Sequence, residues 1–573
     1  MRALLTILLL NFSFATTTSA IKNSGDLNIK SPLSPPYFFA GNFGELRPNH
    51  FHAGLDFRTQ GKVGLPVFAV KDGYVSKIGV SPIGYGNVLY LNHSDGTTTV
   101  YGHLLKFQTS IQEFVKEKQY DKESFALTLN PSVNQFQFKK GDIIAWSGNT
   151  GSSGGPHLHF EIRNTKTEKA ENPLFYPMGI TDKSAPKLIA LYVYPLDETS
   201  NIGKERTKKR LEAISVPGGY RLKNNAPLEV YGKIGFGVQA EDYFNGVGLK
   251  CGIYSAHLYC DKKEVFGFKM DQVAFEDTKY ANSQGDLEEY MSASRRVERL
   301  YKQPGNKLDI YTIPNSSGVL NFNDGKSHDF ELIVSDAFKN KATLHFKTKE
   351  KKSIAPVRPK PHLKEFAYDK SNSFETDKIK IEIPKGALYD NLYFNYSATP
   401  KIAGCYSELH KVGSKTILTH TPYTLSISCE ELPSDLKNKA LIVVVDPVKG
   451  RKSAIGGEYS HGWVTAKTTV MGTFAIAIDQ TPPVIAPLLA KGKKSINISK
   501  LLQFHISDNL SGIKSYIGEI DGNWALFEYD EKMGLLTYTI DKTKLASGKS
   551  HKLRLEVKDN KNNMSEYKTT FNL

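Results

Sequence analysis

The chain has 573 residues, a length of about four ordinary domains and too long for one hydrophobic core. Hydrophobic residues make up 40% of it and charged residues 23%, with a mean hydropathy of -0.37. This composition excludes a disordered chain and a multispanning membrane protein. The formal net charge of +15 favours an anionic partner or surface, because net charge acts on association and not on the fold.

The first twenty residues have the pattern of a secretory signal peptide. Arg2 precedes a short apolar run, and Thr18-Ser19-Ala20 supplies small residues for cleavage. The run is far shorter than the ~20 residues that a spanning helix needs. We therefore expect cleavage after 1–20 and an exported protein without a transmembrane anchor, in the periplasm, in the cell envelope or outside the cell.

The cysteines are too few for a disulfide scaffold. In an oxidising compartment the pairs Cys251/Cys260 and Cys405/Cys429 could each close a loop, but pairing does not follow from sequence. No Cys-x-x-Cys spacing occurs, so we expect structural or free cysteines and no metal on them.

From about residue 35 to 165, short apolar or alternating runs are broken by glycine. These runs predict strands, the clearest of them at 66–70, 73–78, 87–91 and 99–101. A helix is predicted at 110–118, inside a polar stretch that we expect to be a surface insertion beside a site. The fold class predicted for the whole chain is mainly β.

Beyond residue 182 the chain contains an internal repeat. Residues 325–340 and 548–563 both run from Gly-Lys-Ser-His through alternating apolar positions to an Asp and an Asn at matching spacing. An Asp-x-x-x-Gly motif precedes each copy, at 242–246 and 508–512. Period-two strands that end in such turns indicate antiparallel sandwiches, and the two copies resemble bacterial immunoglobulin-like domains. We expect the repeated Asp and Asn to shape turns, with calcium binding as the alternative.

The domain organisation follows from these changes in composition. After a signal peptide at 1–20, the sequence predicts a first domain at 21–182 and an immunoglobulin-like domain at 183–350. A basic, proline-rich linker follows at 351–370. A further β-rich domain is predicted at 371–480 and a second immunoglobulin-like domain at 481–573.

Six of the fifteen histidines lie in the first domain. His157 and His159 are two residues apart in a strand-like run, so both imidazoles project from one face of a sheet. His52 and Asp56 are four apart, and Gly54 between them favours an irregular turn. Two imidazoles and one carboxylate, with a fourth position left to water, are typical of catalytic zinc, although other divalent ions accept such ligands.

No His-Glu-x-x-His motif is present to supply a glutamate base. A histidine must then transfer the proton, which its near-neutral pKa permits. His157 and His103 are the candidates.

The order His-x-x-x-Asp, then Thr-Val-Tyr-Gly-His-Leu, then Gly-Gly-Pro-His-Leu-His-Phe-Glu resembles the lysostaphin/LytM-type zinc endopeptidases, also called β-lytic metallopeptidases. The resemblance covers about 130 residues. It implies a compact antiparallel β fold whose groove holds one zinc ion, and hydrolysis of peptide bonds in peptidoglycan. It also implies that His52, Asp56 and His159 are the zinc ligands and that His103 and His157 are the catalytic histidines. The long stretch from Gln108 to Phe138 departs from the family pattern.

Three other residues of this domain receive weaker interpretations. His50 could replace a ligand, but the His-x-x-x-Asp spacing selects His52. His93 is expected to be structural or to lie behind the ligands. Glu161 shares the strand face of the two histidines and either orients an imidazole or forms a salt bridge.

The predicted function is thus a zinc metalloendopeptidase of the cell wall. The alternatives are a non-catalytic envelope-binding or hydrolase-activating scaffold with a structural zinc, and a peptidase of extracellular proteins. Residues 21–182 carry a net charge of +2, and the chain beyond 182 carries +12. We therefore expect the β-domains to contact an anionic envelope surface, and we expect no nucleic-acid partner.

Overall fold

The computed structural model describes residues 29–246, 248–354, 361–430, 432–488 and 501–573. Regular structure within these ranges is mostly β-strand, which confirms the predicted fold class. The expected signal peptide at 1–20 and residues 355–360 of the expected linker lie outside them. In these ranges, no helix has the length and the apolar character needed to cross a membrane.

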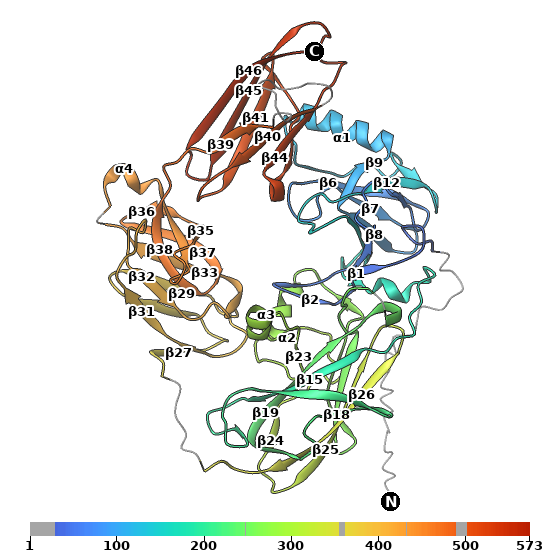
Figure 1. Cartoon of the computed structure of the whole chain (residues 1–573), viewed down its shortest axis with the longest axis vertical. Coiled ribbons are helices and arrows are strands. Elements are labelled where there is room, and N and C mark those ends of the chain that lie inside the picture. The colour runs from blue at the N-terminus through green and yellow to red at the C-terminus, as the bar shows by residue number, and fades with distance from the viewer. Residues whose placement is uncertain (1–28, 247, 355–360, 431, 489–500) are drawn as a thin grey trace, which may run out of the picture.

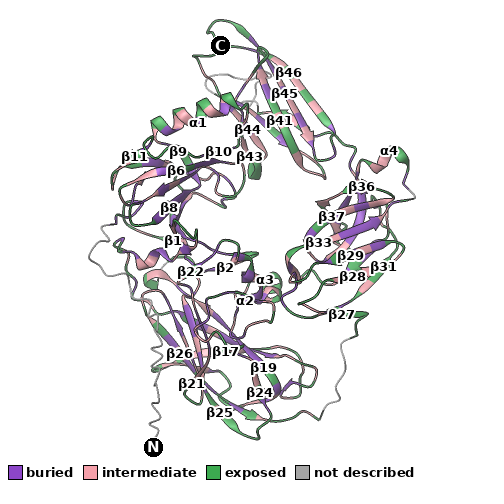
Figure 2. Cartoon of the chain, turned by 180° about the vertical axis from the view of Figure 1, so that it is seen from behind, coloured by how far each residue is buried: buried purple, intermediate pink, exposed green. Residues whose placement is uncertain are grey.

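The chain forms four β-rich parts that follow one another around a closed ring, so that the last part returns to the first (Figure 1). Each part has its own buried hydrophobic cluster. Buried residues follow the central strands of every part, whereas α1 (Thr109–Asp121) carries buried residues on one side only (Figure 2).

The first part contains an antiparallel sheet and a smaller one beside it. The main path of the large sheet runs in the order β1 (Phe39–Gly41), β4 (Leu55–Arg58), β13 (His157–Asn164), β8 (Thr97–Gly102), β7 (Val88–Asn92), β6 (Gly73–Val80) and β10 (Leu127–Leu129). The smaller sheet has the order β5 (Pro66–Phe68), β12 (Ile143–Ser147) and β9 (Leu104–Phe107). The strands predicted from sequence correspond to β5, β6, β7 and β8.

The register of three neighbouring strands gathers the polar residues of this sheet. His159 on β13 lies opposite Asp56 on β4 and opposite Gly102 on β8. A Cβ atom on Gly54 would lie 2.3 Å from the carbonyl oxygen of Phe160, so only glycine lets the segment before β4 approach β13 this closely. The turn that Gly54 predicted thus sets the distance between His52 and the sheet.

The predicted helix is present as α1, slightly longer than expected, and it closes the ring. Its inner side packs on the first part through Ile111 and Val115. Its outer side meets the last part, where Lys116 forms a 2.6 Å ion pair with Asp541. The ring of Tyr120 packs edge-on against Trp524 at 5.2 Å. The insertion is therefore an interface within the chain as well as a surface feature.

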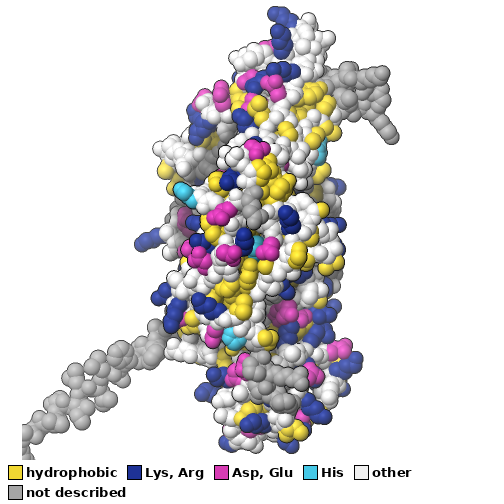
Figure 3. All heavy atoms as spheres, turned by 90° about the vertical axis from the view of Figure 1, so that its left-hand side faces the viewer, with side chains coloured by type: hydrophobic (Ala, Val, Ile, Leu, Met, Phe, Trp, Pro, Cys, Tyr) yellow, Lys and Arg dark blue, Asp and Glu magenta, His cyan; other side chains and the backbone are white. Residues whose placement is uncertain are grey.

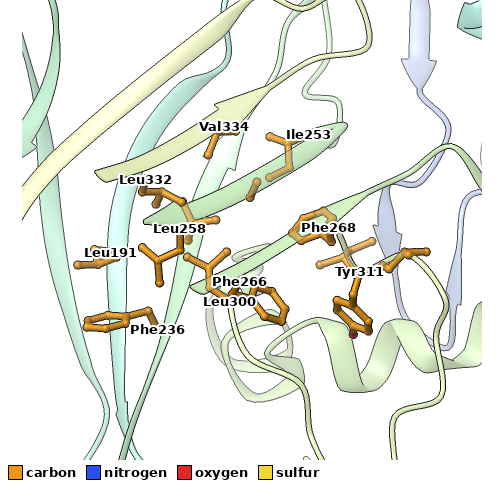
Figure 4. Packing of buried hydrophobic residues seen from close by; sticks show 14 of the residues in the cluster. Leu191, Phe236, Ile253, Leu258, Phe266, Phe268, Leu300, Tyr311, Leu332 and Val334 are labelled. Carbon is orange, nitrogen blue, oxygen red and sulfur yellow. The ribbon is translucent and has the colours of Figure 1, made fainter. Parts of the chain in front are cut away.

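The second part is a large sheet whose main path runs in the order β16 (Asn201–Ile202), β19 (Leu228–Glu241), β15 (Lys187–Pro195), β17 (Lys209–Val216), β18 (Gly219–Leu222), β26 (Lys341–Glu350), β25 (Ser327–Ser335), β20 (Ser255–Cys260) and β21 (Lys263–Lys269). Aromatic and branched side chains from several of these strands form its core (Figure 4). The short helices α2 (Ala281–Gln284) and α3 (Leu287–Ala293) lie towards the third part, where Tyr280 stacks on His420 at 4.2 Å.

The third part has two five-stranded sheets. One has the order β28 (Asn372–Glu375), β29 (Ile379–Ile383), β33 (Leu418–Ser428), β37 (Trp463–Val470) and β36 (Glu458–Ser460). The other has the order β31 (Tyr396–Thr399), β32 (Leu409–Val412), β38 (Gly472–Ile478), β34 (Ala440–Val445) and β35 (Lys452–Gly456). On the face of the molecule seen in Figure 3, Lys and Arg side chains lie among Asp and Glu side chains.

The last part has two four-stranded sheets. Their orders are β39 (Val484–Pro487), β40 (Leu501–Ser507), β44 (Leu535–Thr539), β43 (Glu528–Asp530), and β42 (Asn523–Trp524), β41 (Ile513–Ile520), β45 (Ser550–Asp559), β46 (Met564–Asn572). The internal repeat forms equivalent antiparallel hairpins, β25–β26 in the second part and β45–β46 here. All four cysteines lie in the described ranges, and each is a free thiol there.

Candidate metal centre

Three side-chain atoms converge at the centre of the large sheet of the first part. The Nε2 atom of His52 lies 3.0 Å from Oδ1 of Asp56 and 3.1 Å from Nδ1 of His159, and that Nδ1 atom lies 2.9 Å from the same oxygen. All three side chains are buried. The structure thus brings together the three residues that the sequence singled out as metal ligands.

The outer contacts of the two imidazoles fix which nitrogen carries a lone pair. Nδ1 of His52 lies 2.8 Å from the backbone oxygen of Asn42, which can only accept, so Nδ1 is the donor. Nε2 of His159 donates in the same way to Oε1 of Glu161 at 2.8 Å. Nε2 of His52, Nδ1 of His159 and the Asp56 oxygen therefore face one another, and this arrangement is stable only with a cation between them, either a proton or a metal ion. These donors fit zinc, which takes imidazole nitrogen at about 2.0–2.1 Å.

The charges around this point favour a cation. Burial would raise the pKa of the Asp56 carboxyl, but His52, His157 and His159 hold it well below its usual range. Burial alone lowers the pKa of His159, but hydrogen bonds to Asp56 and Glu161 and their negative charges raise it to about 9. Burial lowers the pKa of His52 to about 4, so this ring is neutral and able to act as a ligand.

A second layer of side chains holds the three residues in place. Arg47 donates to the other oxygen of Asp56 at 2.7 Å. Glu161 is fully buried and joins His159 to Arg163, whose Nε lies 2.6 Å from its second carboxylate oxygen. The hydroxyl of Tyr85 also donates to Glu161, at 2.5 Å. Glu161 therefore both orients an imidazole and forms a salt bridge, which the sequence left as two alternatives.

His157 and His103 lie beside this cluster, with their ring centroids 4.7 Å apart. Nδ1 of His103 donates to the backbone oxygen of Thr150 at 2.8 Å, and Nδ1 of His157 donates to that of Gly155 at the same distance. Each ring thus keeps its Nε2 atom as a proton acceptor. Nε2 of His157 is 3.5 Å from Oδ1 of Asp56. Burial, together with His159 and His157, lowers the pKa of His103 to about 3.

The loop between β12 and β13 is held from the far end of the chain. Lys532 in the last part donates to the backbone oxygen of Gly151 at 3.2 Å and to that of Asn149. These carbonyls flank Thr150, the acceptor that orients His103. The end of the chain thus contacts the loop that positions one of the two candidate catalytic histidines.

The two weaker histidine candidates lie outside the convergence. His50 is exposed, and its Nδ1 contacts the backbone oxygen of Pro48. His93 is buried between the backbone oxygen of Asp72 and the hydroxyl of Thr99, both at 2.8 Å. His93 therefore has a structural position, as expected.

Sequence reasoning missed three contributors. Asn42 and Arg47 precede the ligand motif without any recognisable pattern, because their contacts depend on how the chain folds back on β4. Tyr85 stands between Gly84 and Gly86, in a run without any charged residue or histidine that would indicate a role at a metal site. Its ring lies 5.3 Å from that of His159.

Comparison with known proteins gives two family matches. Residues 50–120 match the profile described as Peptidase family M23, and residues 364–479 match a Zu5-like domain. The match with Peptidase family M23 lies in the first part and includes His52, Asp56 and His103.

Individual proteins are similar to limited portions of this chain. An uncharacterized metalloprotease of Haemophilus influenzae is 37% identical over 131 residues, 23% of this chain and 21% of that protein. The DD-carboxypeptidase/endopeptidase Mpg of Neisseria meningitidis is 32% identical over 112 residues, 20% of each chain. The solved catalytic domain of lysostaphin from Staphylococcus simulans is 29% identical, with 24% of this chain and 90% of that chain covered and a TM-score of 0.19. The chain spans about a fifth of the length of the two curated relatives.

Proposed function

We propose that this chain is a zinc metalloendopeptidase that hydrolyses peptide bonds in peptidoglycan, with His52, Asp56 and His159 as zinc ligands. The observation that carries the proposal is the convergence of three lone-pair atoms at 2.9–3.1 Å in a buried site. Two further histidines stand beside them with Nε2 available. A structural site would need no such pair.

Zinc bound at this point would acidify a water molecule and polarise the scissile carbonyl. The chain's own residues would then move the proton. His157 accepts it at Nε2, because its Nδ1 proton is held by Gly155. His103, neutral at physiological pH, lies against His157 and assists in the same role or stabilises the developing oxyanion. Arg47 and Glu161 keep the ligands in place during turnover.

The substrate class rests on the family resemblance and on the name of one relative. That relative is the DD-carboxypeptidase/endopeptidase Mpg of Neisseria meningitidis. The DD prefix in its name denotes bonds between D-configured residues, which occur in the stem peptides of peptidoglycan. Export through the expected signal peptide at 1–20 would bring the enzyme to the periplasm or the cell envelope. The excess of positive charge beyond residue 182 supports weak attachment of the β-domains to an anionic envelope.

The test is digestion of purified peptidoglycan by the full-length, zinc-loaded protein. We expect soluble fragments and new amino termini, and mass spectrometry of the fragments would identify the bond. A glycine-rich protein digested in parallel tests the protein-substrate alternative. Intact peptidoglycan after prolonged incubation with a protein that contains one zinc per chain would contradict the proposal and favour a scaffold.

A further inference from the structure

Three aspartates meet in a buried cluster at the junction between the first and second parts. Asp182 precedes β15, Asp242 follows β19, and Asp336 follows β25. One oxygen from each of the three lies within 4.8 Å of the others, and the side chains are 6%, 2% and 2% exposed. None of them forms an ion pair with a described lysine, arginine or histidine. Three carboxylates in so small a volume repel one another strongly.

Turn formation accounts for only part of these oxygens. Oδ1 of Asp182 accepts from the backbone N–H of Ser184 and of Asn245, at 2.9 and 2.8 Å. Both oxygens of Asp336 accept hydrogen bonds, with Asn340 as a partner of each. Oδ2 of Asp182 and Oδ1 of Asp242, in contrast, are buried without a hydrogen-bond partner among the described residues. Buried carboxylate oxygens are rarely left in this state.

We propose that Asp182, Asp242 and Asp336 bind a hard divalent cation, with calcium as the preferred ion. Calcium takes carboxylate oxygens at about 2.3–2.6 Å, so two ligands on opposite sides of the ion are separated by about 4.8 Å. A purely oxygen donor set selects calcium or magnesium over zinc. The cation would satisfy the two unpartnered oxygens and offset the repulsion that no side chain offsets.

The electrostatics of Asp242 agree with this geometry. Burial, followed by the charges of Asp336 and Asp182, raises the pKa of Asp242 to about 8. Burial also raises the pKa of Asp336, with a smaller contribution from the charge of Asp182 and against the hydrogen bonds from Asn340, which lower it. Without a cation, the folded chain therefore holds a proton in this cluster at neutral pH. One proton reduces the repulsion among the three carboxylates less than a divalent ion bound by all three.

A matching constellation lies where the third part meets the last part, and it includes Asp559 of the second repeat copy. Asp479, Asp508 and Asp559 also offer oxygens within 4.8 Å of one another. Asn563 donates to the backbone oxygen of Asp479, as Asn340 does to that of Asp182. Oδ1 of Asp508 is buried without a partner among the described residues.

The second cluster differs from the first in the groups that offset its negative charges. Both oxygens of Asp479 accept backbone N–H groups, and the buried cation of Lys561 acts on Asp479 and Asp559. Among the described residues, no lysine acts on Asp242 or Asp336 in this way. We therefore assign the tighter site to the first cluster and use the second as its matched control.

The experiment is calcium binding by isothermal titration calorimetry on the full-length, zinc-loaded protein after removal of calcium. Asp242→Asn should weaken the tightest binding step by at least about 100-fold, and Asp508→Asn should leave it unchanged. Magnesium should bind more weakly than calcium to the wild-type chain. Unchanged tight binding in Asp242→Asn, its loss in Asp508→Asn, or no calcium binding up to about 10 mM would each overturn the proposal.

A stability measurement separates a lost site from a misfolded chain. In calcium-free buffer above about pH 8, where the Asp242 carboxyl is ionised, Asp242→Asn removes one of three repelling charges and should unfold at the wild-type temperature or above it. Calcium at about 100 times its Kd should raise the wild-type Tm by about 5 °C and leave that of the variant unchanged. A variant that unfolds below the wild-type chain in calcium-free buffer would show that Asp242 serves the turn alone, and the proposal would fail.

Discussion

The candidate metal centre of the first part and the three-aspartate cluster of the second part are both buried polar groups on β-sheet scaffolds. They differ in donors and in support. Each of the rings of His52 and His159 uses one nitrogen to donate a hydrogen bond to a neighbouring oxygen, and its other nitrogen faces the convergence point. Two carboxylate oxygens of the aspartate cluster have no partner among the described residues. The difference separates a site shaped for chemistry from one that holds parts of the chain together.

Asn42 connects the two regions. Its side-chain nitrogen donates to the backbone oxygen of Gly252, and its side-chain oxygen accepts from the backbone N–H of Gly252, both at 2.8 Å. Its backbone oxygen accepts a hydrogen bond from Nδ1 of His52. Gly252 follows Cys251, which pairs with Asp242 through two backbone hydrogen bonds. The second part therefore supports the site as well as following it in the chain.

Loss of an inner ligand should have the largest effect. His159→Ala removes a lone pair that no neighbour can replace, so the variant should lose bound zinc and at least about 1,000-fold in kcat/KM. Metal analysis and peptidoglycan release measure both quantities. Calcium binding by the aspartate cluster should be unchanged in this variant, and a joint loss of both would break the separation between the two regions.

His103→Ala should separate metal binding from turnover. Because His103 is not one of the three converging residues, zinc should remain at one per chain while kcat falls by about 100-fold to 10,000-fold. His50→Ala is the control, since that exposed ring lies outside the convergence. Wild-type turnover in His103→Ala would remove this residue from the proton transfer.

Glu298 provides a comparison with the aspartate cluster, because it is a single buried carboxyl and not one of three. Burial raises its pKa to about 8, and its Oε2 atom has no partner among the described residues. The folded state holds this proton between about pH 4.5 and 8 whereas the unfolded state releases it, so wild-type stability falls as pH rises through that window.

Glu298→Gln should equal the wild-type chain below about pH 4.5 and become more stable by up to about 2 kcal/mol above pH 8. Urea unfolding at a series of pH values measures the difference. Calcium should not alter it, because one carboxylate is no calcium site. A difference independent of pH would show that the proton is not held there.

Lys532→Ala should have the smallest effect. It releases two carbonyls beside Thr150 and loosens the acceptor of His103, so kcat should fall by about 2-fold to 5-fold with zinc retained. Lys542→Ala, a nearby change at an exposed lysine, should have none. Equal kinetics in the two variants would limit the ring closure to a structural role.

The sequence was informative where spacing and local period determine the geometry. Residues two apart on a strand share a face, which predicted the common orientation of His157 and His159. Gly54 predicted the turn before β4. Arg47 and Asn42 could not be found in this way, since their contacts arise from the path of the chain between separate strands.

The aspartates show the same limit. Turn chemistry predicted the hydrogen bonds of Asp336 correctly. It could not reveal that Asp182, which lies outside the repeated motif, folds into the same cluster. Likewise, the helix α1 was predicted from its apolar spacing, but its contact with a domain about 400 residues away was not.

The most direct test of the central claim is a zinc titration of the chelator-stripped, full-length protein, with peptidoglycan hydrolysis measured at each addition. We predict that activity rises linearly and reaches its plateau at one zinc per chain, and that His159→Ala stays inactive throughout. Full activity without zinc, or zinc bound at one per chain with no hydrolysis at any point, would contradict it.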